Sequence, residues 1–439
     1  MMDKDQALEF LKKAGALCTA GESCAMLTGT RVSRTRFANN GIRQVESGTD
    51  EVLNLRVYDG KRMAEVETND LGDTGVALAA KTAADLLKAA PEDPEYVGAP
   101  AAAEIPEVEA SFESVEKFSP DDGAAMAGAA IKVFRGAGVT GAGAVEAAAA
   151  YTAMLSSAGF TAHHRTTSLT FTASARSDKG GAGWVGRVSN QAETVKPDIL
   201  AQIAAEKAAS SGSPKPMTPG SYTVVLEPQA TAELLAFLLF MLDARAADEG
   251  RSFFSKKKGG NRIGEKIFAP TFTLTTDATG VVFLGRPFDD EGIPQTKTPW
   301  IEKGELKNLY YSRFWAKKNG RKPTARPNHV MMKGGGTLLE DIIKATDRGI
   351  LVTRFWYTNI TDPRTLSITG VTRDGTFFIS GGKIAQPLSN MRFNISIPDV
   401  LARIDMMSGP QRVPEMGGGI ACPSVRMTDF RFSTASEAV

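Results

Sequence analysis

The chain has 439 residues, and its 51 Lys and Arg residues nearly balance its 50 Asp and Glu residues, giving a formal net charge of +1. This balance argues against a chain built mainly to bind nucleic acid or an anionic membrane surface. With only three cysteines and three histidines, a disulfide framework, a cysteine-rich zinc ribbon and an iron–sulfur cluster are all disfavoured. At roughly 150 residues per domain, the length predicts two or three domains.

The N-terminal residues and the apolar runs of the chain predict a soluble, cytoplasmic protein. The N-terminal residues show no basic segment followed by an apolar core, so we expect no secretory signal. The longest apolar run, residues 234–242, is far shorter than the roughly 20 residues that a membrane-spanning helix needs. The three cysteines are expected to be buried free thiols of a reducing compartment.

The first half of the chain reads as helices alternating with antiparallel strands. Turn signals at Asn39-Asn40-Gly41 and at Tyr58-Asp59-Gly60 divide residues 26–70 into a meander of three or four strands. Hydrophobic periodicity and composition predict the remaining elements: a helix over 5–14, a helix over 76–90, an exposed connector over 91–106, a helix over 119–134, strands within 151–188 and a helix over 196–209.

A Pro- and Gly-rich segment over residues 210–220 marks the predicted domain boundary, because it cannot continue a helix. We therefore predict an N-terminal α+β domain over 1–212 and a strand-rich C-terminal domain over 213–439. The overall class is α+β, with antiparallel or mixed sheets and flanking helices. The elements expected after the boundary are a strand over 222–226, a helix over 229–246, a helical piece over 338–345, and strands over 271–275, 281–283, 349–356, 365–371, 376–379, 391–397 and 424–432.

Residues 136–141 form a G-x-G-x-x-G pattern, the signature of a dinucleotide-binding turn. That function needs a βαβ unit with an acidic residue at the end of its second strand. The residues that follow are an alanine stretch and then hairpins, so we interpret the segment as a flexible Gly/Ala linker.

Several polar residues are candidates for a site. His163 and His164 are adjacent on a predicted strand and point to opposite faces, so they cannot bind one metal together; one is expected buried and the other solvated. His329 lies in a loop and is a candidate substrate contact. Asp289, Asp290 and Glu291 are consecutive, which favours a structural turn over a calcium or magnesium loop. The basic loop at 256–262 is interpreted as a solvated run of charge.

Four segments carry a resemblance to a known family: residues 30–45 continued by 55–61, the strand 220–228 (GSYTVVLEP), the loop 288–294 (FDDEGIP) and the turn 304–306. In this order they resemble the TldD/PmbA family of zinc metallopeptidases over essentially the full chain. The loop and the turn that follows it are the most specific matches.

The resemblance also implies a missing metal site. Catalytic members carry HExxxH on the helix that follows the V-V-L-x-P strand, with two histidines for zinc and a glutamate base. Here Ala236 and Phe237 stand at the His-Glu pair and Met241 stands at the second histidine. The stretch that matches the family's third ligand, a cysteine, is 406–409, and Cys422 comes too late. An apolar helix over 234–242 also reads as a buried packing element.

The chain is thus similar to the PmbA/TldE-type subunit, a pseudoenzyme that pairs with a zinc-bearing TldD-type subunit around a peptide cavity. The resemblance implies no bound cofactor in this chain and no catalytic residue, with zinc held by the partner. The balance of charge predicts no nucleic acid and no membrane as a partner. The alternative is a stand-alone homodimer that binds peptides without hydrolysis. A third hypothesis is an unrelated enzyme at the same cavity that uses Asp290, Glu291, His329 or Arg354.

Overall fold

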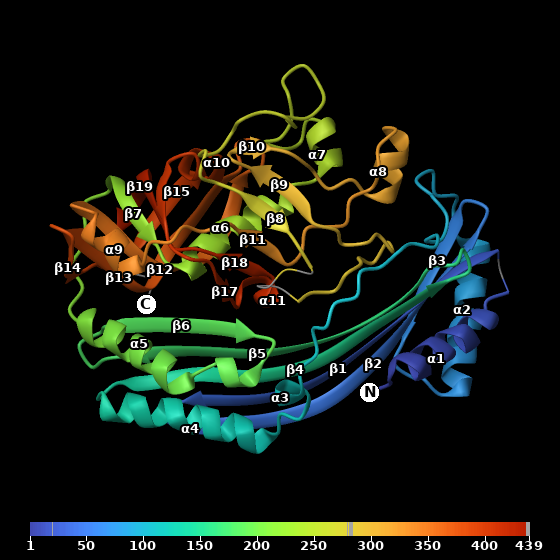
Figure 1. Ribbon diagram of the computed structural model, residues 1–439, viewed down its shortest axis with the longest axis horizontal. Helices are drawn as coiled ribbons and strands as arrows, with labels where there is room; N and C mark the ends of the chain where they lie inside the picture. Colours follow the sequence, from blue (N-terminus) through green and yellow to red (C-terminus); the bar gives the residue numbers. More distant parts are fainter. Residues whose placement is uncertain (20, 279, 281–283, 436–439) are drawn as a thin grey trace.

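The computed structural model describes residues 1–19, 21–278, 280 and 284–435 and divides into two layered parts. Figure 1 shows a long curved sheet with helices along its outer side, and a strand-rich part above the opposite side. The α+β class predicted from the sequence is confirmed. The predicted strand at 281–283 lies outside the described residues. Within the described residues, no helix is both long and apolar enough to span a membrane.

The curved sheet is formed by two antiparallel meanders that meet in its middle. Its strand order is β3-β2-β1-β4-β5-β6. The predicted turn at Asn39-Asn40 is confirmed, since both residues adopt positive φ angles of 52° and 53° between the first two strands. The strands are β1 (Glu22–Ala38), β2 (Gly41–Asp59), β3 (Arg62–Thr68), β4 (Thr140–Ser156), β5 (Thr161–Arg176) and β6 (Ala182–Ser189).

Helices cover the outer side of this sheet (Figure 1). Alternate residues of β1, including Ala25, Leu27 and Phe37, are buried beneath them, as expected of strands with one covered face. The helices are α1 (Lys4–Ala16), α2 (Asp73–Ala89), α3 (Glu113–Glu116), α4 (Pro120–Gly136) and α5 (Pro197–Ser210), with a 3-10 turn at Ala192–Thr194.

The flexible linker predicted around residues 136–141 is wrong, because Thr140–Ser156 is the strand β4. The glycines of this segment are packing residues. A Cβ atom at Gly141 would collide with the ring of Phe134, and one at Gly143 would collide with the carbonyl oxygen of Thr172. Small residues let α4 and the neighbouring strand approach β4 closely, so a Gly/Ala composition here marks tight packing.

The start of α4 depends on a capping box at Ser119. The Ser119 hydroxyl accepts a hydrogen bond from the N–H of Asp122, and the Asp122 carboxylate accepts one from the N–H of Ser119. Ser119→Ala is expected to lower the free energy of unfolding by about 1 kcal/mol in urea titrations. Ser210→Ala, at the opposite end of a neighbouring helix, is the control and should change it by less than about 0.5 kcal/mol. Equal losses in both variants would contradict the capping role.

The strand-rich part contains two further sheets. One has the order β10-β9-β8-β11-β18-β17, and the other has β12-β7-β19-β15-β13-β14 with β16 paired to β19. Their strands are β7 (Gly220–Leu226), β8 (Leu274–Thr276), β9 (Thr298–Glu302), β10 (Glu305–Leu306), β11 (Val330–Met332), β12 (Arg348–Asp362), β13 (Ser367–Ser380), β14 (Lys383–Pro387), β15 (Met391–Ser396), β16 (Ile404–Met407), β17 (Gln411–Val413), β18 (Ile420–Cys422) and β19 (Val425–Ala435).

The helix predicted over 229–246 is two helices in the structure. α6 (Pro228–Phe240) ends before Asp243, and the Asp243 side chain accepts a hydrogen bond of 2.6 Å from the N–H of Ala246 to begin α7 (Ala244–Asp248). An aspartate N-cap starts a new helix and therefore divides the apolar run. The strands predicted separately over 365–371 and 376–379 are one strand, β13. The short helices of this part are α8 (Arg313–Lys318), α9 (Leu339–Lys344), α10 (Ile397–Leu401) and α11 (Glu415–Gly418).

Side chains join the two parts beside β6. Arg412 of β17 donates a hydrogen bond of 2.6 Å to the Asn190 side chain, and Lys207 of α5 forms a 2.6 Å ion pair with Glu227 at the start of α6. The domain boundary predicted at 212/213 falls between α5 and β7 and stays a prediction.

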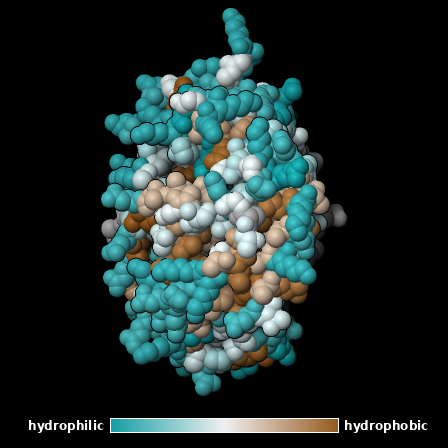
Figure 2. Space-filling view, turned by 90° about the vertical axis from the view of Figure 1, so that its right-hand side faces the viewer, coloured by the Kyte–Doolittle hydropathy of each residue, from teal (hydrophilic) through white to brown (hydrophobic). Residues whose placement is uncertain are grey.

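The end of the molecule that carries α1, α2 and β3 has some apolar residues on its surface. Figure 2 views the molecule from the right-hand side of Figure 1 and shows apolar and weakly polar residues in a band across its middle, between hydrophilic regions. Exposed apolar side chains of these elements and their flanks are Leu17, Met63, Leu78 and Leu86. Single exposed apolar residues are ordinary on a protein surface, so these four assign no interaction on their own.

Candidate functional site

The helix α6 is the element on which the sequence places the lost metal motif. Pro228 occupies its first turn, where the missing N–H costs nothing, directly after the strand β7. Leu234, Leu235 and Leu238 are fully buried in the core of the strand-rich part. The prediction of a buried packing element is confirmed for these residues.

The prediction fails at the end of the helix, where Phe240 is 74% exposed. The less buried residues of α6 follow one another at steps of one turn or less, so they form a stripe along one side of the helix. They are Glu233, Ala236, Phe237 and Phe240. Two of the three positions that the family motif would fill, Ala236 and Phe237, belong to this stripe. The third, Met241, follows the last residue of the helix and is buried.

A cluster of carboxyl groups lies at the N-terminal end of this stripe. The Glu233 carboxyl accepts a hydrogen bond of 2.9 Å from the N–H of Phe355 and one of 3.2 Å from the Gln229 amide. The same amide nitrogen donates to Glu415 at 3.0 Å. Gln229 thus holds two carboxyl groups close together.

Burial, together with the neighbouring Glu415 and against the lowering effects of Arg354 and of its hydrogen bonds, raises the pKa of Glu233 to about 8. Burial also raises the pKa of Glu415. Like charges in a shared buried site cannot both ionise cheaply, so Glu233 is mostly protonated near neutral pH. The third acidic group near this helix, Glu227, pairs with Lys207.

Cys422 lies against the start of α6 and is completely buried. Its thiol donates a hydrogen bond of 3.0 Å to the carbonyl oxygen of Pro228, and burial raises the pKa of the thiol above its usual range. A thiol with a raised pKa is a poor nucleophile and a poor metal ligand.

Arg354, a predicted binding residue, is engaged in an ion pair. Its guanidinium donates hydrogen bonds of 2.9 Å and 2.5 Å to Asp374, which is buried on the neighbouring strand β13. It also lies over the rings of Trp184 and Trp356, 5.1 Å and 5.3 Å from their centroids. Because Trp184 belongs to β6, Arg354 connects the two parts of the molecule.

The acidic loop at 288–294 is a structural turn, as predicted. The buried Asp289 carboxylate accepts hydrogen bonds from the backbone N–H groups of Glu291, Ile293 and Arg326. Glu291 accepts from the Tyr310 hydroxyl at 3.1 Å and from the N–H of Arg313 at 2.8 Å. Asp290 forms a 2.6 Å ion pair with Arg286.

The histidines lie apart from the α6 cluster. His329 packs its ring against Gly285, and burial together with Arg412 and Arg286 lowers the pKa of His329 to about 4. Burial, His329 and Arg286 also lower the pKa of the buried His164 to about 4. His163 faces the other side of β5 and stacks on Tyr151. Its side chain is half-buried, whereas the sequence predicted a solvated one.

The four predicted binding residues therefore do not form one site. Asp290 and His329 share the neighbourhood of Arg286, Glu291 supports the loop, and Arg354 lies beside α6. In the part of the chain that the structure describes, no group of three or more His, Cys, Asp and Glu side chains is placed to hold a metal. Sequence reasoning missed Gln229, Glu233 and Glu415; the signal available was a lone carboxylate four residues after Gln229 in an otherwise apolar helix.

Comparison with known proteins identifies the region that holds this cluster. Residues 219–434 match the PmbA/TldA metallopeptidase C-terminal domain. This match covers the strand-rich part of the chain, from the start of β7 almost to the end of β19. The family resemblance drawn from the sequence is confirmed.

Curated relatives of the family carry metalloprotease names. A metalloprotease TldD homolog of Buchnera aphidicola is 28% identical over 42% of this chain and 41% of that protein. A metalloprotease of Methanocaldococcus jannaschii is 25% identical over 44% of this chain and 45% of that protein. The matched stretch thus spans less than half the length of these curated relatives.

The fold likeness extends over the whole chain. The crystal structure of TldE from Thermococcus kodakarensis aligns with a TM-score of 0.87 at 19% identity, covering 97% of this chain and all of that one. The TldD/PmbA-like architecture therefore includes the curved sheet as well as the strand-rich part.

Proposed function

We propose that this chain is the metal-free, TldE-type subunit of a TldD/TldE-type metallopeptidase complex that acts on peptides in proteolysis or maturation. The carrying observation is the helix α6, which keeps its place after β7 but presents Ala236 and Phe237 where the family motif has its His-Glu pair. Neither side chain offers a donor atom to zinc, which takes Cys, His, Asp or Glu ligands.

The polar groups near α6 support the proposal. Glu233 is protonated near neutral pH and occupied by Phe355 and Gln229, so it is a poor replacement for a metal ligand. In this proposal the TldD-type partner holds the zinc and its hydrolytic water. This chain supplies part of the partner interface and one wall of the peptide cavity, with Phe240 as an exposed apolar contact.

The proposal is tested by measuring bound metal and peptide hydrolysis for three samples: this chain, a TldD-type subunit from the same source, and the two mixed. We expect no stoichiometric zinc and no hydrolysis from this chain alone. The mixed sample is expected to elute as one complex, carry zinc and cleave unfolded peptides.

Two outcomes would overturn the proposal. Tightly held stoichiometric zinc with peptidase activity in this chain alone would show a catalytic subunit. A stable dimer of this chain that does not associate with the TldD-type subunit and binds peptides without cleaving them would favour the stand-alone peptide-binding protein.

A further inference from the structure

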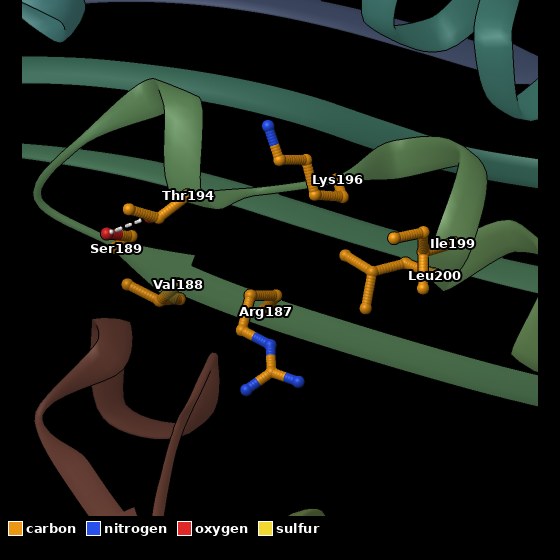
Figure 3. Close-up of a pocket in the computed structure, with 7 residues that line it drawn as sticks. All are labelled: Arg187, Val188, Ser189, Thr194, Lys196, Ile199 and Leu200. Atoms are coloured by element: carbon orange, nitrogen blue, oxygen red, sulfur yellow. Dashed lines mark hydrogen bonds between the residues drawn. The ribbon is translucent and has the colours of Figure 1, made fainter.

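A pocket of about 360 Å³ lies at the edge of the curved sheet, on the strand β6. Figure 3 shows the pocket between the end of this strand, the segment that precedes α5, and the first turn of that helix. Because β6 is the last strand of the curved sheet, one of its edges is not covered by a further strand of that sheet. The lining residues are Arg187, Val188, Ser189, Thr194, Lys196, Ile199 and Leu200.

With Lys196, Arg187 is one of the two cations that line this pocket. Burial lowers its pKa from the usual range, and burial is the only cause of the shift. In the described part of the chain, its guanidinium makes no hydrogen bond or ion pair with a protein side chain or carbonyl group. Figure 3 shows the guanidinium pointing away from the β6 backbone and away from Lys196.

An unpaired, partly desolvated guanidinium is unusual in this protein. The comparably enclosed Arg56 has Glu65 at 3.0 Å, and Arg354 has Asp374 at 2.5 Å. Desolvating a charge without a partner costs free energy, which an anionic ligand would recover. A guanidinium is also shaped for two parallel hydrogen bonds to one carboxylate.

A second partly buried arginine lies beside the same strand end. Arg412 lines an adjoining pocket of about 210 Å³ that shares Val188 and Ser189 with the first. Burial lowers the pKa of Arg412 to about 10, and its guanidinium donates to Asn190. The end of β6 is thus flanked by positive charge where the two parts of the molecule meet.

The other lining groups indicate what accompanies the anion. Ser189 and Thr194 supply hydroxyl groups that already bond to each other at 2.6 Å. Ile199 is 59% exposed and adds an apolar wall on the first turn of α5. Two cations, Arg187 and Lys196, together with hydroxyl groups and an apolar wall suit a carboxylate that is attached to an aliphatic or aromatic group.

We propose that this pocket binds a carboxylate group of a peptide, held by Arg187, with the adjacent side chain against Ile199. This rests on the proposed function, because it makes this subunit the one that selects among peptides. The carboxylate is either the C-terminal group of the peptide or an acidic side chain.

The test uses the full chain without its partner and fluorescently labelled ten-residue peptides in anisotropy titrations. One peptide has a free C-terminus, the second is its C-terminal amide, and the third is an amide with one internal Asp. We expect removal of every carboxylate to weaken binding about tenfold, which corresponds to about 1.4 kcal/mol. The third peptide separates the two sources, since it regains affinity only if an acidic side chain suffices.

Arg187→Gln is expected to remove the preference for carboxylates, and Arg187→Lys to retain part of it, because the charge remains but the paired hydrogen bonds are lost. Arg176→Gln, at an exposed position at the end of β5, is the matched control and should bind like the unmodified chain. Thermal unfolding of all three variants checks that each is folded.

A carboxylate preference that survives in Arg187→Gln, or no preference in the unmodified chain, would overturn the inference. The proposed function fails separately: if the chain binds carboxylates through Arg187 but forms no complex with a TldD-type subunit, the pocket stays assigned and the complex is refuted. If the complex hydrolyses acid and amide peptides at equal rates, the proposed function stands and the carboxylate pocket is refuted.

Discussion

Glu233→Gln is expected to stabilise the protein at pH 8 and to leave its stability at pH 4.5 nearly unchanged. The pKa of Glu233 is about 8 in the folded chain against an ordinary value of 4.5, so between these values the folded state holds a proton that the unfolded state has released. The free energy of unfolding therefore falls as the pH rises from about 4.5 to 8, by at most about 1.4 kcal/mol per pH unit. Gln carries no titrating proton and keeps an oxygen for the N–H of Phe355.

Urea titrations across this pH range measure the effect, with Glu92→Gln, at an exposed position after α2, as the control. The unmodified chain and the control should lose stability in parallel between pH 4.5 and 8, and Glu233→Gln should lose much less. Some dependence should remain, because burial also raises the pKa of Glu415. If the free energy of unfolding of Glu233→Gln changed with pH as it does in the unmodified chain, the Glu233 carboxyl group would be ionised in the folded state. The raised pKa would then be contradicted.

Arg354→Ala is expected to lower the free energy of unfolding by about 3 kcal/mol, because it leaves the buried Asp374 without its main partner. Arg373, whose Nε lies 3.8 Å from the same carboxylate, compensates only partly. The variant also removes the contact with Trp184, which connects β12 to β6 across the two parts.

Urea titrations at constant pH measure this loss of stability. Two further variants test whether the unpaired charge of Asp374 causes it. Arg373→Ala should cost less than about 1 kcal/mol, since that pair is long and partly exposed. The double variant Arg354→Met with Asp374→Asn should cost less than Arg354→Ala, because no buried charge is left unpaired. If Arg354→Ala kept full stability and lost peptide binding, Arg354 would be a binding residue, as the sequence hypothesis proposed.

The elements that could be predicted from the sequence are those whose local residue pattern favours the same structure as their packing in the folded chain. The meander over 26–70 has turn residues at Asn39 and Asn40 that accept positive φ, and α4 has the Ser119 cap. The first part of the strand β4, residues 140–150, could not be predicted, because alanine and glycine carry no strand preference of their own. Their role comes from close packing against Phe134 and Phe171, which the local sequence does not show.

The site was harder to predict than the fold. The resemblance singled out α6, but the residues that hold its polar contacts come from three distant segments: Gln229 and Glu233, Phe355 on β12, and Glu415 after β17. Arg187 gives no signal in the sequence, since a lone arginine on a strand is usually solvated. Its significance depends on burial without a partner, which only the folded chain shows.

The order of the curved sheet, β3-β2-β1-β4-β5-β6, has a consequence for how the chain is made. Each half of the sheet is a three-stranded meander with a helix before it and a helix after it, and the halves meet at the antiparallel pairing of β1 with β4. During synthesis one long edge of β1 therefore has backbone groups without a strand partner until β4 has left the ribosome. A nascent chain that stops before Thr140 should accordingly recruit chaperones or aggregate, whereas one that extends through Ser189 has the strand that covers this edge.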